Sequence, residues 1–204
     1  LQSGNNITLK SSATATANVG IMTGSNAISG NVTVERYTDV GIGHGASWQF
    51  VATPAQGQTV KASWMENGCC IAPLVSTGYG TQITGTGTGF DLTTSAPSLK
   101  YYNPVTDGWT GVTNTGDPVY NPNGYMLFVR GDRSKVYPNV GNTTLRTSGT
   151  LFSATNLPPS IPVTAGHFAS VGNPYASAIN MENLNSKMNN VINFFYIWDP
   201  TLTG

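Results

Sequence analysis

Few side chains in this sequence can take part in acid–base chemistry. The 204 residues include nine Asp and Glu, nine Lys and Arg and two His. Asp107, Asp117, Asp132 and Asp199 each lie beside Gly, Pro or Arg, and Asp in such a setting forms turns far more often than it acts as an acid. A glycosidase pair of carboxylates is possible in space but has no support in the sequence. We therefore expect no enzyme activity.

The two histidines offer a weak hydrolase hypothesis. His44 lies in Gly43-His44-Gly45 and His167 precedes Phe168, and neither accompanies a Gly-x-Ser-x-Gly nucleophile elbow. A hydrolase would need one of them to meet a carboxylate in a cleft, within reach of a substrate proton.

Cys69 and Cys70 are adjacent, so they cannot join distant strands as ordinary disulfides do. They are interpreted as two small apolar residues, with a vicinal disulfide as the alternative and a soft-metal site as a third reading. No further Cys, His or Asp is spaced to complete a zinc site. Calcium is left open because Asp and Asn cluster at 103–107 and 114–123, although no Asp-x-Asp-x-Asp-Gly spacing occurs.

Aromatic side chains suggest carbohydrate binding as a second function. Trp109, beside Asp107 at the tip of an expected hairpin, is the best candidate, and Tyr101 and Trp48 are further candidates. Such rings also fill sandwich cores and cover hairpin ends. Because Tyr101 and Tyr102 are consecutive, they must face opposite sides of a strand, so at least one belongs to the core.

Arg130-Gly131-Asp132 spells an integrin-recognition tripeptide. The simpler reading is that Gly131 makes a turn, while Arg130 or Arg133 pairs with Asp132 or with a C-terminal carbonyl. We expect no adhesion through this tripeptide.

The elements that must position these side chains are mostly strands. Alternating or apolar runs at 8–12-residue intervals, separated by Gly, Pro and Asn turns, predict about ten to twelve strands. The expected strands cover 7–19, 28–37, 47–52, 81–84, 99–102, 108–112, 125–130, 145–151, 160–164 and 193–198, with 125–130 central because it is the most apolar. A short helical turn is expected within 60–68, and the one good helix near residues 178–190.

This pattern predicts an all-β antiparallel β-sandwich with one short helix. It allows one large or two small sandwiches of the jelly-roll or Ig-like kind. Two parts are expected, an N-terminal β-rich part at 1–95 and a C-terminal β-sandwich part at 96–204, or else a single continuous domain.

Composition excludes several other classes. Charged residues make up 9% of the chain and the formal net charge is zero, whereas average soluble domains carry about 25% charged residues. Without a basic excess, nucleic-acid binding is not expected. No apolar run reaches the roughly 18 residues of a membrane helix, so no membrane insertion is expected.

Several phrases resemble a β-rich, adhesin-like region of large secreted Bacteroidota proteins, located just upstream of the domain that directs type IX secretion. These phrases are Gly124-Tyr125-Met126-Leu127-Phe128-Val129-Arg130-Gly131-Asp132-Arg133, Leu145-Arg146-Thr147-Ser148-Gly149, Gly172-Asn173-Pro174-Tyr175-Ala176-Ser177 and Phe195-Tyr196-Ile197-Trp198-Asp199-Pro200. Further likeness lies at 9–15 and 78–85. The chain departs from the group by its Cys69-Cys70 pair and by ending where such proteins continue. The resemblance implies a secreted cell-surface module without catalytic machinery.

We therefore expect a non-catalytic structural or adhesin-like β module. Its partners would be other copies of itself, paired through the small-residue strand at 7–19 into filaments, or neighbouring domains of its parent protein. The alternative is a carbohydrate-binding module that recognises a polysaccharide.

Overall fold

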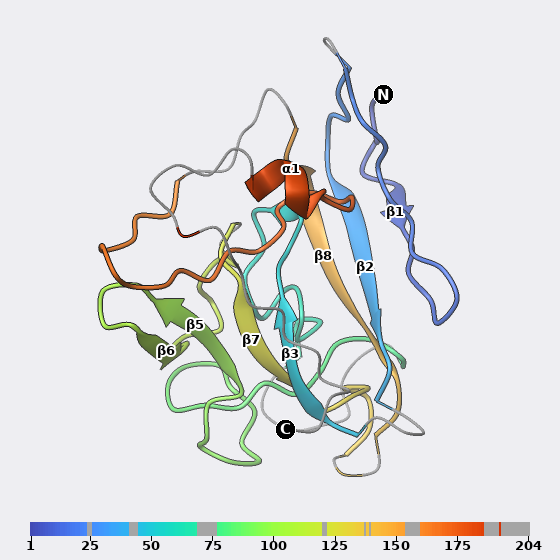
Figure 1. Cartoon of the computed structure of the whole chain (residues 1–204). Helices are drawn as coiled ribbons and strands as arrows, with labels where there is room; N and C mark the ends of the chain where they lie inside the picture. The colour runs from blue at the N-terminus through green and yellow to red at the C-terminus, as the bar shows by residue number, and fades with distance from the viewer. Residues whose placement is uncertain are drawn as a thin grey trace.

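The computed structural model describes residues 1–23, 26–40, 45–68, 77–119, 122–136, 138, 140–153, 160–185 and 192. One sheet contains, in spatial order, β1 (Ile7–Leu9), β2 (Val32–Thr38), β8 (Thr143–Leu151) and β4 (Ala55–Gln56). The other contains β3 (Ser47–Val51), β7 (Tyr125–Val129), β5 (Leu99–Asn103) and β6 (Gly108–Gly111) (Figure 1). β1 and β2 run parallel, and the other neighbouring strands run antiparallel.

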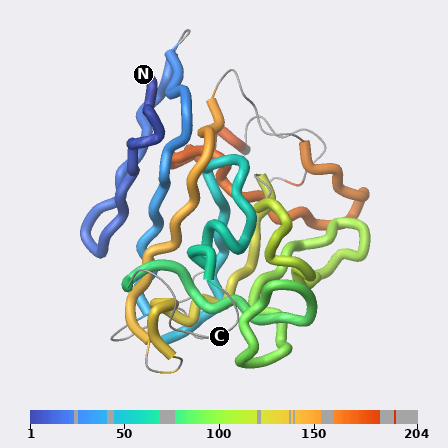
Figure 2. Tube along the Cα trace, turned by 180° about the vertical axis from the view of Figure 1, so that it is seen from behind, coloured from blue at the N-terminus to red at the C-terminus, as the bar shows by residue number. Residues whose placement is uncertain are grey.

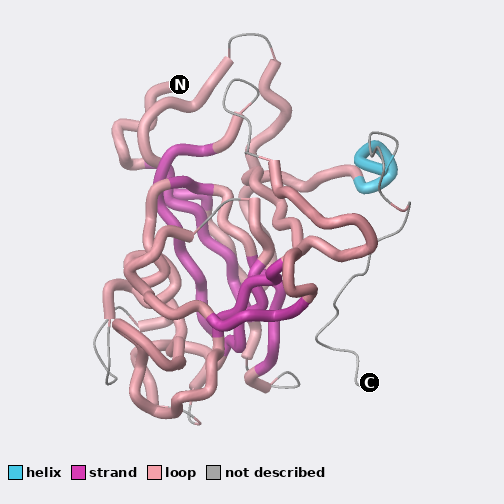
Figure 3. Tube along the Cα trace, turned by 90° about the vertical axis from the view of Figure 1, so that its left-hand side faces the viewer, coloured by secondary structure: helices cyan, strands magenta, loops and turns pink. Residues whose placement is uncertain are grey.

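This architecture confirms the predicted all-β sandwich with one short helix. The helix, α1, covers Met181–Asn185 within the predicted range, and residues 186–190 lie outside the described residues. Figure 3 shows the strands gathered in the middle of the molecule, with α1 set apart at one side. No helix in the described part of the chain is long and apolar enough to span a membrane.

Each sheet combines strands from both halves of the sequence. β8 lies between β2 and β4, and β7 lies between β3 and β5. A division between residues 95 and 96 therefore does not coincide with a boundary between the sheets.

β7 shows how the sequence pattern builds the second sheet. Tyr125, Leu127 and Val129 are buried, while Met126 and Phe128 between them are partly exposed. This alternation follows from the two-residue period of a strand. β7 pairs with β3 on one side and β5 on the other, so the predicted central position is confirmed.

Loops cover the buried face of this sheet. In Figure 2 the teal segment around residue 60 lies between the orange trace of β8 and the yellow trace of β7. Trp64 from this segment packs edge-on against Tyr125, with ring centroids 5.6 Å apart. The core cluster joins loop and strand residues: Val40, Val60, Trp64, Met65, Ile83, Phe90, Leu99, Val119, Tyr125, Leu127, Val129 and Leu145. Loop residues therefore provide much of the core that a second sheet would supply in a regular sandwich.

A buried ion pair joins two of these loops. The Arg133 side chain is 2% exposed and that of Asp91 is 3% exposed, and their closest contact, Nη1 to Oδ2, is 2.6 Å. Arg133 Nη2 donates to Asp91 Oδ1 at 2.7 Å, which makes the pair bidentate. Arg133 also donates to the carbonyl oxygen of Thr81, and Asp91 accepts from the backbone N–H of Ile83. Both charges are thus paired and hydrogen-bonded, as burial requires.

The Arg130-Gly131-Asp132 tripeptide belongs to the same buried region. Arg130 is 9% exposed and Asp132 is 3% exposed, so the tripeptide is not presented to a receptor. Gly131 makes the expected turn at φ +101°. The expected pairing is corrected, because Arg133 pairs with Asp91, and Arg130 donates to the Gln82 carbonyl and to Thr84 Oγ1.

Several local predictions need correction. Within 7–19 only Ile7–Leu9 form a strand, because the chain folds back at 10–17, where the Ala17 N–H donates to the Lys10 carbonyl. No strand forms at 160–164, whereas the short helical turn expected within 60–68 is matched by turns at 60–67, where the Ser63 N–H donates to the Thr59 carbonyl four residues earlier. The described residues contain eight strands, fewer than expected, because 81–84 contributes only an isolated bridge and 160–164 contributes no strand. Cys69, Cys70, His44 and the predicted strand at 193–198 lie outside the described residues.

The ion pair gives a stability prediction. Asp91→Asn leaves the Arg133 guanidinium buried without its counter-charge, so we expect the free energy of unfolding to fall by about 3–5 kcal/mol. Glu66→Gln is the matched control, since it neutralises the more exposed Arg146–Glu66 pair, whose Arg146 side chain is 29% exposed. That change should cost about 1 kcal/mol or less. Urea unfolding measures both changes in the free energy of unfolding. Equal losses in the two variants would contradict the larger contribution expected of the buried pair.

Candidate functional site

The β5–β6 hairpin carries the side chains that sequence analysis favoured. β5 and β6 pair from Lys100–Gly111 to Asn103–Gly108. Asn103 Oδ1 accepts from the backbone N–H groups of Val105 and Thr106, and Asp107 adopts a left-handed φ of +53°. Asn and Asp favour such turns because their short side chains bond the nearby backbone. The turn thus holds Asp107 next to the two strands.

Trp109 is held in place by two other rings. It stacks on Phe50 of β3, with centroids 5.5 Å apart and an interplanar angle of 24°. Tyr102, its direct neighbour across the hairpin, meets it edge-on at 5.3 Å. Offset stacking and edge-to-face contacts are the favourable arrangements for aromatic pairs. The Trp109 ring is therefore fixed while partly exposed.

Asp107 fixes the outer end of Tyr102. The Tyr102 hydroxyl donates to Asp107 Oδ1 at 2.6 Å, and the backbone N–H of Phe168 donates to the same oxygen at 3.2 Å. These two hydrogen bonds, in that order of importance, lower the pKa of Asp107, and the charge of His167 lowers it further. The hydrogen bond to Asp107 is also the main reason that the pKa of Tyr102 is raised.

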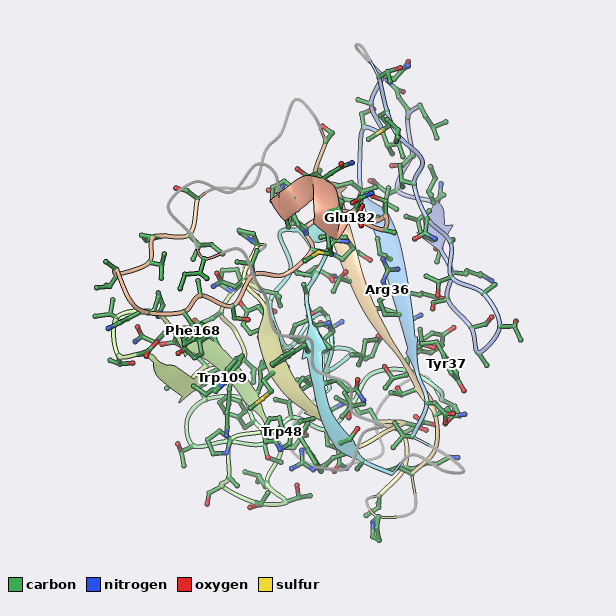
Figure 4. All side chains as sticks on the ribbon, in the orientation of Figure 1. Arg36, Tyr37, Trp48, Trp109, Phe168 and Glu182 are labelled. Atoms are coloured by element: carbon green, nitrogen blue, oxygen red, sulfur yellow. The ribbon has the colours of Figure 1, made fainter. Side chains whose placement is uncertain are left out.

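Trp48 lies on β3 of the same sheet, two strands away from β5. It packs edge-on against Phe128 at 5.4 Å, and Lys100 Nζ lies 4.7 Å from its ring centroid. In Figure 4 Trp109 lies between Trp48 and Phe168. The strand register places Trp48 on the same face as Tyr102 and Trp109. The structure thus gathers Trp109 and Asp107 at the hairpin and leaves Trp48 on β3.

Tyr101 faces the other way, as expected for the neighbour of Tyr102. Its ring packs against the main core cluster, yet it also lines a surface depression of about 250 Å³ next to the hairpin. Strand and hairpin residues line one side of the depression and the segment 160–170 lines the other: Tyr101, Tyr102, Pro104 and Asn123, then Ser160, Ile161, Pro162, Ala169 and Ser170.

Sequence reasoning missed Asn123 and the 160–170 wall of this depression. Asn123 forms an isolated bridge with Val171, and Ser170 Oγ donates to the carbonyl of Gly124 at 3.1 Å. These contacts bring 160–170 onto the start of β7. The local pattern at 160–164 predicted a strand, but a local pattern cannot show which distant segment a loop will contact.

His167, the histidine among the described residues, contacts the backbone and lies near the carboxylate of Asp107. His167 Nδ1 contacts the carbonyl oxygen of Pro104 at 2.8 Å, while Asp107 is occupied by Tyr102 and Phe168. Among the described residues, no three of His, Cys, Asp and Glu form a group that could hold a metal ion. The amide oxygens of Asn103 and Asn114 instead accept backbone N–H groups of their own turns.

Comparison with known proteins gave no match, since no family model fits the chain and no curated protein or solved structure is detectably similar to it. The function must therefore be argued from the site.

The Tyr102–Asp107 pair predicts a pH dependence of the hairpin. Because the pKa of Asp107 is lowered, its contribution to stability is present above the ordinary Asp pKa and is lost as pH falls through the lowered value. Because the pKa of Tyr102 is raised, its contribution is present below the ordinary tyrosine pKa and is lost as pH rises through the raised value.

NMR titration of the Asp107 carboxyl carbon and the Tyr102 ring carbon that bears the hydroxyl measures both values. In Asp107→Asn the pKa of Tyr102 should return toward its ordinary value, since the charged acceptor is gone. An unchanged Tyr102 titration in that variant would contradict the pairing.

Proposed function

We propose that this chain is a non-catalytic, adhesin-like binding module of a secreted cell-surface protein, and that it contacts its target with the β5–β6 end of the second sheet. The observation that carries the proposal is the fixed, partly exposed Trp109 ring between Phe50 and Tyr102. Aromatic side chains held in one geometry lose little conformational entropy on binding, and such residues dominate binding energies.

The chemistry around Trp109 supports binding rather than catalysis. Asp107 is held by two hydrogen bonds that lower its pKa, and a general acid or base works best with a pKa near the working pH. The hydrogen-bonded pair of Tyr102 and Asp107 therefore acts as a brace for the hairpin. Secretion and surface location rest on the resemblance of the sequence phrases alone.

An adhesion assay tests the contact surface. Microspheres coated with the chain are passed over cellulose, chitin, mucin and collagen, and the retained fraction is measured on each. Trp109→Ala should reduce retention on the recognised surface about tenfold, as expected when a central aromatic contact is removed. Tyr37→Ala is the matched control, because Tyr37 lies on β2 of the other sheet. Equal retention of the parent and a folded Trp109→Ala variant would contradict the proposal.

Self-assembly through strand pairing is a second candidate, favoured by the position of β1. β1 is the outermost strand of its sheet, and an edge strand presents backbone groups to which another chain can pair. The strand is short, since only Ile7–Leu9 are extended.

Thr8→Lys tests this candidate. Thr8 is exposed in the middle of β1, and a lysine on an edge strand opposes pairing. If copies pair through β1, filaments of the parent chain in negative-stain images should disappear in this variant. Thr150→Lys, at an exposed position of the interior strand β8, should leave them intact. Filaments that persist in Thr8→Lys, or a parent chain that stays monomeric at high concentration, would exclude pairing through β1.

A further inference from the structure

We infer that the depression beside the β5–β6 hairpin binds one neutral sugar residue of a glycan. This inference rests on the proposed function, because it assigns a ligand class to the same end of the sheet. It draws on three features of the depression, namely its unpaired polar groups, its lack of charge and its size.

Polar groups without protein partners converge on the depression. Within the described part of the chain, the side chains of Tyr101, Asn123 and Ser160 make no intramolecular hydrogen bond, although all three line it. Asn123 offers two donors and one carbonyl acceptor, and each hydroxyl can both donate and accept. Ser170 Oγ donates to Gly124 and keeps its acceptor sites. Such a mixture matches a ligand whose own groups are hydroxyls.

The described lining carries no charge. It contains no Lys, Arg, His, Asp or Glu. The nearby Asp107 is bonded to Tyr102 and Phe168, and His167 Nδ1 lies against the Pro104 carbonyl. A carboxylate or phosphate placed here would lose hydration without gaining a cation, which is costly. The depression therefore favours a neutral sugar over a uronic acid or a phosphorylated group.

Shape and rigidity point to a single sugar ring. The volume of about 250 Å³ is below the range of roughly 300–1,000 Å³ that holds drug-sized ligands. Tyr102 supplies an aromatic wall that is already fixed by Asp107 and Trp109, so little side-chain entropy is lost on binding. The ring and the adjacent Pro104 and Ile161 offer apolar surface to the C–H face of a sugar.

The test is an NMR titration with methyl glycosides. Glucose, galactose, mannose and N-acetylglucosamine represent neutral residues, and glucuronic and galacturonic acid represent acidic ones. We expect at least one neutral glycoside to shift the ring signals of Tyr101 and Tyr102 with a Kd on the order of 1 mM, a value common for weak single-site ligands. The acidic glycosides should bind at least about fivefold more weakly, because no cation faces their carboxylate.

Two variants assign the site. Asn123→Asp keeps the shape but replaces two donors with a negative charge, and Ser160→Ala removes one hydroxyl; each should weaken binding about fivefold. Asn31→Asp is the matched control, since Asn31 is exposed near the start of β2 on the other sheet. Neither changed side chain is buried or paired, so unfolding should stay as in the parent.

The outcomes separate this inference from the proposed function. Three results would overturn the sugar site. None of the neutral glycosides shifts the ring signals of Tyr101 and Tyr102, or the acidic glycosides bind as tightly as the neutral ones, or neither variant weakens binding. If adhesion to mucin or collagen still depends on Trp109 in that case, the proposed function stands and its target is recognised by protein–protein contacts. If neutral glycosides bind at Asn123 while Trp109→Ala leaves adhesion intact, the sugar site stands and the assigned contact surface is wrong.

Discussion

The buried, bidentate pair between Arg133 and Asp91 joins the loop after β7 to the loop that precedes β5. Arg133 follows β7 closely in the sequence, and Asp91 follows the loop residues Ile83 and Phe90 that cover the sheet. Apolar residues can replace a buried ion pair at little cost, whereas removal of one partner is expensive. The pair thus acts mainly by fixing which loop meets which strand. β5 is hydrogen-bonded to β7, and β6 is hydrogen-bonded to β5. The position of the β5–β6 hairpin therefore follows from the position of β7.

The low charge of the sequence has a structural explanation. Some of the few charged side chains are buried, namely the Arg133–Asp91 pair and Arg130. At the hairpin, Asp107 braces Tyr102 rather than facing solvent alone. The described lining of the depression next to the hairpin carries hydroxyl, amide, aromatic and aliphatic groups. The low charge of the sequence thus agrees with the uncharged lining of this depression.

Sequence reasoning predicted the fold class, the β5–β6 hairpin and the central β7 because each depends on local periodicity and turn chemistry. It also predicted correctly that Tyr101 and Tyr102 would face opposite sides of their strand, because alternation is geometric. It failed for 7–19, whose small alternating residues fit both a strand and a tight fold-back. Asn123 and Ser160 could not be found, because loops far apart in the sequence bring them together.

The strand order also determines when the molecule can fold. β2 and β4 are both hydrogen-bonded to β8 and not to each other, and β7 lies in the same way between β3 and β5. Until residue 151 is available, the first sheet has no middle strand, and the earlier strands expose apolar faces with nothing to cover them. Contacts of such long sequence separation make folding slow, and uncovered strands invite aggregation while the chain waits. A newly made chain therefore exposes the earlier strands of this sheet until β8 has been synthesised.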